Sequence, residues 1–261
     1  MKKFLLFLLF FSILTVAAYS QSTEEKWNTA KSTHFIVYYK NAPESFIEEL
    51  INKSEDFYDR IADRLGFTRF NFWLWENRAK IYIYDDAQDY QNKTGQPGWS
   101  SGAAFPKKKT IVTFPYAKDF FVTLLPHEMG HIIFREFVGS DNPALTDWLD
   151  EGVACYQEQG RCLLSYPIIQ QAVNSGKIIA LPKLSQIEVR SVADTAQVQL
   201  FYAESVCIVD YLIKKFGKDD FVNFCQYLRD RKDLKIAIAS VYPFSSLEEL
   251  DGAWQEYLKS H

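Results

Sequence analysis

The sequence has few histidines and cysteines, and it lacks an excess of basic residues. Its 261 residues include four His and four Cys, and 33 Asp+Glu exceed 29 Lys+Arg, which gives a formal net charge of −4. A general nucleic-acid-binding protein normally carries a basic excess, so no nucleic-acid partner is expected. Hydrophobic residues make up 48% and charged residues 24% of the chain. This ordinary globular composition argues against a largely disordered or coiled-coil protein.

Long hydrophobic runs are also scarce. The single long run lies at the N-terminus. Two lysines precede an apolar run that extends from Phe4 to Ala18, and small residues at Ala18 and Ser20 fit a cleavage site. This pattern predicts a secretory signal peptide over residues 1–20. The run is shorter than the roughly 20 apolar residues of a spanning helix, so we expect cleavage and no stable membrane insertion afterwards. The expected product is a secreted or periplasmic protein with residues 21–261 in one domain.

The four cysteines are too widely spaced to form a C-x-x-C motif. They are Cys155, Cys162, Cys207 and Cys225. A redox motif or a thiolate zinc ribbon is therefore not indicated. Export would permit disulfides, and four cysteines allow three connectivities, but buried free thiols are an equally acceptable interpretation.

The hydrophobic periodicity differs between the two halves of the chain. The first half predicts strands over 33–39, 79–84, 102–105 and 110–114, a helix over 44–65 that ends at Gly66, and a short helix that follows Asp85 and Asp86. The second half predicts helices over 118–137, 150–159, 163–174, 198–216, 221–230 and 246–260. Pro126 falls inside the first of these, so residues 118–125 could form a separate turn with Pro126 in the first turn of the next helix. Strands followed by helices indicate an α+β domain.

Two of the four histidines lie four residues apart around a glutamate, in His127-Glu128-Met129-Gly130-His131. On a helix, residues four apart lie on nearly the same face, so both imidazoles can reach one metal ion. Glu128 is displaced by about a quarter turn from His127, which lets its carboxylate face a metal-bound water. Imidazole nitrogen suits zinc, which lowers the pKa of the water to about 7, and Glu128 can take the proton as general base. The strongly apolar flanks argue against a chance match on a surface helix.

The segment from Asp147 to Tyr156 reads DWLDEGVACY. Together with H-E-x-x-H it resembles the gluzincin branch of zinc metallopeptidases, the peptidase MA-like families. In these families a W-L-x-E-G-x-A-x-Y segment on the next helix supplies a glutamate as third ligand. By that resemblance Glu151, 20 positions after His131, binds zinc together with His127 and His131. We expect Glu151 at the start of its helix.

The resemblance extends from about Leu124 to Leu258. It implies a thermolysin-like zincin domain, in which a small N-terminal mixed sheet with helices precedes a mostly helical C-terminal half that carries the zinc site. Tyr202 lies in the segment Phe201-Tyr202-Ala203-Glu204-Ser205, which is similar to the helix that follows the zinc glutamate. Its phenol is the candidate for stabilising the oxyanion of the tetrahedral intermediate.

The chain departs from the family pattern at two places. Cys155 occupies a position where many relatives carry an acid that holds a ligand histidine. A thiol is a weak substitute, so either Asp150 or another acid takes that role or the site is weakened. Residues 102–105 lack the Met-Glu-Asn of the aminopeptidases, so trimming from the amino terminus is not supported.

These features predict an exported zinc-dependent metallopeptidase, an endopeptidase that hydrolyses peptide bonds through a zinc-bound water activated by Glu128. The expected partner is a peptide or protein substrate, which could pair with residues 102–105. Two alternatives stay open: a non-catalytic zinc-site scaffold or peptide-binding protein, and a zinc hydrolase of a non-peptide amide. A sugar substrate would need exposed aromatics such as Trp73, Trp75 and Trp99, for which core or rim packing is the preferred interpretation.

Overall fold

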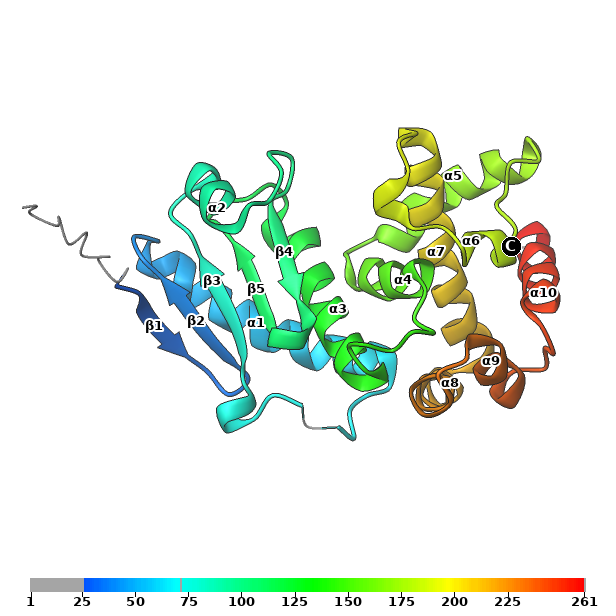
Figure 1. The fold of residues 1–261 in the computed structure, drawn as a ribbon, viewed down its shortest axis with the longest axis horizontal. Coiled ribbons are helices and arrows are strands. Elements are labelled where there is room, and N and C mark those ends of the chain that lie inside the picture. The colour runs from blue at the N-terminus through cyan, green and yellow to red at the C-terminus, as the bar shows by residue number, and fades with distance from the viewer. Residues whose placement is uncertain (1–25, 71, 261) are drawn as a thin grey trace, which may run out of the picture.

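A computed structural model describes residues 26–70 and 72–260 (Figure 1). The predicted signal peptide lies outside the described residues. The described part begins with a mixed sheet of five strands in the order β1-β2-β3-β5-β4. The strands are β1 (Asn28–Lys31), β2 (Phe35–Tyr39), β3 (Ala79–Ile83), β4 (Gly102–Phe105) and β5 (Thr110–Thr113). β2, β3 and β5 run parallel, and β1 and β4 are antiparallel strands at the two edges.

The strands form where apolar side chains alternate. Phe35 and Val37 of β2 and Ile81 and Ile83 of β3 are fully buried, whereas the residues between them are partly exposed. This pattern buries one face of the sheet, and α1 (Glu44–Leu65) and α3 (Leu125–Val138) lie on one side of it (Figure 1). The four predicted strands are confirmed with small shifts at their ends. β1 was not predicted, because its sequence NTAK is polar and mostly exposed.

Two predicted helices of the first half are confirmed. α1 has the predicted bounds and ends at Gly66, whose φ of 79° lies in the left-handed region that glycine tolerates. α2 (Ala87–Thr94) begins after Asp86, whose side chain accepts a hydrogen bond from the backbone N–H of Asp89.

The second half of the described chain is mostly helical, as predicted. Its helices are α4 (Asp147–Gln157), α5 (Arg161–Asn174), α6 (Leu181–Leu184), α7 (Thr195–Phe216), α8 (Lys218–Arg231), α9 (Leu234–Val241) and α10 (Leu247–Ser260). α4 packs against both α3 and α7, so it joins the sheet-bearing half to the helical half (Figure 1). α6 and α9 were not predicted, because elements of one or two turns show little periodicity.

The segment 118–137 is divided at the point where its proline falls. A turn of π-helix, η3 (Phe120–Leu124), precedes α3, and Pro126 lies in the first turn of α3. A proline at this position removes a donor that has no intrahelical partner anyway. The distinct turn expected before Pro126 is therefore present over residues 120–124, but it continues into α3 without leaving the helical conformation, because Leu124 and Leu125 are both helical.

The structure also settles the cysteine and tryptophan alternatives. All four cysteines are free thiols. Trp73 is fully buried, but Trp75 and Trp99 are 80% and 86% exposed, so the packing interpretation is wrong for these two. Among the described helices, none combines the length and apolar character needed to cross a membrane.

Candidate metal centre

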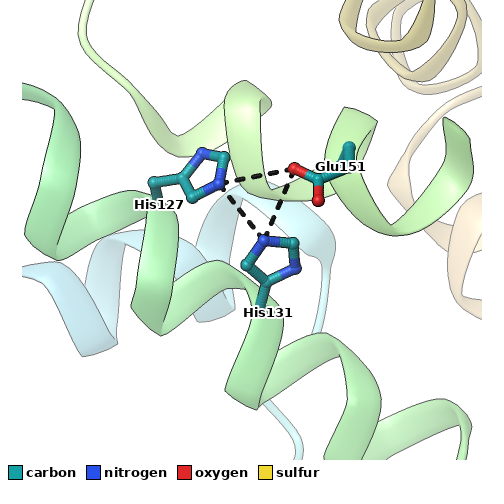
Figure 2. Close-up of side chains that lie close together, drawn as sticks. All are labelled: His127, His131 and Glu151. Carbon is teal, nitrogen blue, oxygen red and sulfur yellow. Dashed lines mark hydrogen bonds and ion pairs between the residues drawn. The ribbon is translucent and has the colours of Figure 1, made fainter. Parts of the chain in front are cut away.

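Three of the predicted site residues converge where α3 and α4 face each other. Figure 2 shows His127 and His131 of α3 and Glu151 of α4 pointing toward one another. The Nε2 atoms of the two imidazoles lie 3.2 Å apart. Oε2 of Glu151 lies 3.5 Å from Nε2 of His127 and 3.6 Å from Nε2 of His131.

Glu151 lies in the second turn of α4, because the helix begins at Asp147, earlier than expected. Thr146 precedes it in an extended conformation, and the Asp147 carboxylate accepts a hydrogen bond from the backbone N–H of Val189. The expectation that Glu151 opens the helix is therefore wrong. The extra turn sets the carboxylate inside the helix pair rather than at its end.

Two glycines set how closely α4 packs against its neighbours, Gly130 at its contact with α3 and Gly152 at its contact with α7. A Cβ on Gly130 of α3 would lie 3.0 Å from Cα of Ala154 on α4. A Cβ on Gly152 of α4 would lie 2.5 Å from the carbonyl oxygen of Ser205 on α7. Since ordinary carbon contacts begin near about 3.5 Å, a larger residue at Gly152 would push α4 away from α7.

The three ligand atoms fit a zinc ion. Zn–N bonds of about 2.0–2.1 Å in a tetrahedral site set the ligand atoms about 3.3–3.4 Å apart, close to the separations of 3.2, 3.5 and 3.6 Å. Oε2 of Glu151 is buried and has no hydrogen-bond partner. A buried carboxylate oxygen without a donor is costly, and a cation between it and the two imidazoles would remove that cost.

The second nitrogen of each imidazole faces a carboxylate. Nδ1 of His131 forms an ion pair at 3.0 Å with Oδ2 of Asp150, which also accepts hydrogen bonds from the Arg135 guanidinium at 3.0 and 2.7 Å. Nδ1 of His127 lies 2.9 Å from Oε1 of Glu158. Such partners select the tautomer that leaves Nε2 free for a metal.

Asp150 was one of the expected alternatives, whereas Glu158 was missed. Glu158 lies seven residues after Glu151 within the helix predicted over 150–159, so the helical spacing that points to Cys155 could also have pointed to it. Cys155 also lies near the site, with Sγ 3.9 Å from Nδ1 of His127. Burial raises the pKa of this thiol to about 11, so it stays neutral.

The electrostatics of the site favour a positive charge between the three ligands. Burial alone would lower the pKa of His131, but the carboxylates of Asp150 and Glu151 outweigh it and raise the pKa to about 10. Burial would raise the pKa of Glu151, but its contacts with His127 and His131 hold it well below its usual range. An ionised carboxylate beside imidazoles that attract positive charge suits a divalent cation as well as protons.

The two candidate catalytic side chains, Glu128 and Tyr202, are not among the three that converge. Glu128 is half-buried beside His127, and its charge adds to the effect of burial in raising the pKa of Tyr90. Tyr202 of α7 is half-buried, and burial followed by the charge of Glu151 raises the pKa of its phenol. The phenol therefore keeps its proton at neutral pH and can donate a hydrogen bond.

A comparison with protein families agrees with this geometry. A family model of the peptidase MA superfamily matches residues 75–260. This range is well over half of the chain, so the protein belongs to the peptidase MA superfamily. No curated protein matches the chain. Membership indicates a metallopeptidase-like hydrolase, and the described residues offer a possible metal-binding group in His127, His131 and Glu151.

Proposed function

We propose that the protein is an exported, zinc-dependent endopeptidase with a thermolysin-like arrangement of its site. The observation that carries the proposal is the convergence of His127, His131 and Glu151, in which a buried carboxylate oxygen without a hydrogen-bond partner faces two imidazole nitrogens. Three protein ligands leave a fourth position for water or substrate, as in catalytic zinc sites. Export rests on the predicted signal peptide at residues 1–20 and implies a secreted or periplasmic location.

A zinc ion bound there would polarise the substrate carbonyl and lower the pKa of a water molecule. Glu128 would accept the proton of the attacking water and deliver it to the leaving amine. Tyr202 would donate its phenolic hydrogen to the carbonyl oxygen as negative charge develops there. Asp150 would keep the imidazole of His131 oriented.

The edge strand β4 offers a place for an extended peptide. β4 pairs with β5 on one side only, and its first residue, Gly102, packs against Leu124 just before the helix of the site. An extended peptide that pairs with the open edge would form backbone hydrogen bonds, which depend little on its side chains. Residues 102–105 carry no acidic side chain that would hold a free amino terminus. This favours cleavage within a chain.

The test combines metal analysis with a digest of a proteome-derived peptide library. We expect close to one zinc per chain in the protein purified after export, and cleavage that a chelator abolishes. Glu128→Gln should keep the zinc and lose about 10²–10⁴-fold in hydrolysis rate, as expected for removal of a general base. Glu48→Gln, which changes an exposed glutamate of α1, is the matched control and should behave as the wild type.

Each alternative has its own outcome. Absence of zinc, or full hydrolysis by Glu128→Gln, would contradict the proposed mechanism. One zinc per chain without cleavage of any peptide would instead favour a scaffold or a hydrolase of a non-peptide amide.

A further inference from the structure

The imidazole of His127 has two possible hydrogen-bond partners: Cys155, in α4, and Glu158, the first residue after α4. The family resemblance expects an acid at position 155, but the residue there is Cys155, and its Sγ lies 3.9 Å from Nδ1 of His127. The carboxylate of Glu158 is closer, with Oε1 at 2.9 Å from the same nitrogen. A thiol is a weak acceptor, whereas a carboxylate forms a strong, charge-assisted hydrogen bond.

We infer that Glu158 is the positioning residue of His127, and that it replaces the acid missing at position 155. Its carboxylate accepts the Nδ1–H of the imidazole, which fixes the ring with Nε2 toward Glu151 and His131. This inference rests on the proposed zinc site and assigns a role that the H-E-x-x-H and W-L-x-E-G segments do not contain. Glu158 does not touch the reacting atoms, so it acts only through His127.

Glu158 can reach the imidazole of His127 because α4 ends at Gln157 and the chain leaves the helical conformation at Glu158. Glu158 is extended, with φ −66° and ψ 143°, and its N–H donates to the carbonyl oxygen of Cys155. The next residue, Gln159, donates its N–H to the carbonyl oxygen of Val122 at 3.2 Å. That bond ties the end of α4 to the turn η3, which leads directly into the helix that carries His127. These two backbone hydrogen bonds hold the segment of Glu158 close to the start of the helix that carries His127.

The other oxygen of Glu158 faces a positively charged side chain. Oε2 lies 3.9 Å from Nε of Arg161, in the first turn of α5. Glu158 is 9% exposed, so its charge is little screened by water. Oε1 therefore makes the close contact with the imidazole, while Oε2 lies on the side of a guanidinium at ion-pair distance. This is what a residue that orients a metal ligand requires.

The test measures zinc affinity, by competition with a chelating dye, rather than activity. Glu158→Gln should weaken zinc binding on the order of 10–100-fold, as for other partners of metal-ligating histidines. Adding Cys155→Asp to that variant should restore most of the loss, because a carboxylate at 155 reaches further toward Nδ1 than the thiol does. Glu48→Gln is the control and should leave the affinity unchanged. Unchanged affinity in Glu158→Gln, or no recovery in the double variant, would overturn the inference.

A second measurement uses the wild-type protein and does not depend on a variant that folds. In ¹⁵N NMR of the zinc-loaded protein, His127 should show a protonated Nδ1 and a metal-bound Nε2. Coordination through Nδ1 would refute the role of Glu158 while leaving the zinc site intact. A wild type that binds no zinc would overturn both the inference and the proposed function.

Discussion

Gly152→Ala is a change of one methyl group that separates the role of helix spacing from that of ligand chemistry. The new Cβ would lie 2.5 Å from the carbonyl oxygen and 2.8 Å from the carbonyl carbon of Ser205. Since carbon atoms pack at about 3.5–4.0 Å, α4 must move away from α7 by about 1 Å. Glu151 is the preceding residue on α4 and moves with it. Ligand distances in metal sites hold to within about 0.2 Å, so the carboxylate would no longer match the two imidazoles.

We therefore expect Gly152→Ala to weaken zinc binding at least about tenfold and to lower the free energy of unfolding by about 1–3 kcal/mol. For a chain of this size that corresponds to a fall in melting temperature of about 2–12 °C. Dye competition gives the affinity and calorimetry the melting temperature. Gly252→Ala, in α10, is the control, because its Cβ would meet no atom within 4 Å. It should leave zinc binding unchanged and stabilise the helix by up to about 1 kcal/mol.

Equal zinc affinity and equal melting temperature in Gly152→Ala and the wild type would refute this reasoning. The close approach of α4 and α7 would then not be what places Glu151. A loss of stability with unchanged zinc affinity would show that α4 adjusts without moving its carboxylate.

Two further predictions concern pH and metal removal. Burial raises the pKa of Glu204, whose Oε1 accepts the N–H of Ile179 at 2.9 Å, from 4.5 to about 8. The neutral carboxylic acid therefore contributes its full stabilisation of the fold below the unfolded pKa of 4.5. This contribution is lost as the pH rises to about 8, and the free energy of unfolding falls by at most about 5 kcal/mol. Glu204→Gln, which mimics the neutral acid, should flatten the fall in melting temperature over that range, and a curve parallel to that of the wild type would contradict this. A chelator should lower the melting temperature of the wild type, since an ion that binds only the folded state stabilises it, and an unchanged melting curve would count against a resident metal.

Features that depend on neighbours in the sequence could be predicted. The bounds of α1 follow from its apolar periodicity and from Gly66, and the start of α3 follows from Pro126. The pairing of His127 with His131 follows from the same helical geometry, because residues four apart share a face. Each of these needs only the local sequence.

Features that depend on packing could not be predicted in the same way. The early start of α4 reflects the contact between Asp147 and Val189, which are far apart in the sequence. Glu158 was missed although it lies seven residues after Glu151, within the helix predicted over 150–159, because the family pattern draws attention to position 155 and only the packing of α4 on α3 shows which side chain reaches His127. β1 was missed because pairing with β2, rather than its own polar sequence, makes it a strand.

The position of the third ligand, Glu151, depends both on the local sequence and on packing. Glu151 by itself is one acidic residue among 33 Asp+Glu, and nothing local brings it to α3. The adjacent Gly152 sets how closely α4 lies against Ser205 of α7, and so limits where Glu151 lies between its two neighbouring helices. Gly130 does the same between α3 and α4. The glycines of the H-E-x-G-H and E-G segments are therefore part of the metal site in a physical sense: they set the helix separations that the ligand distances require.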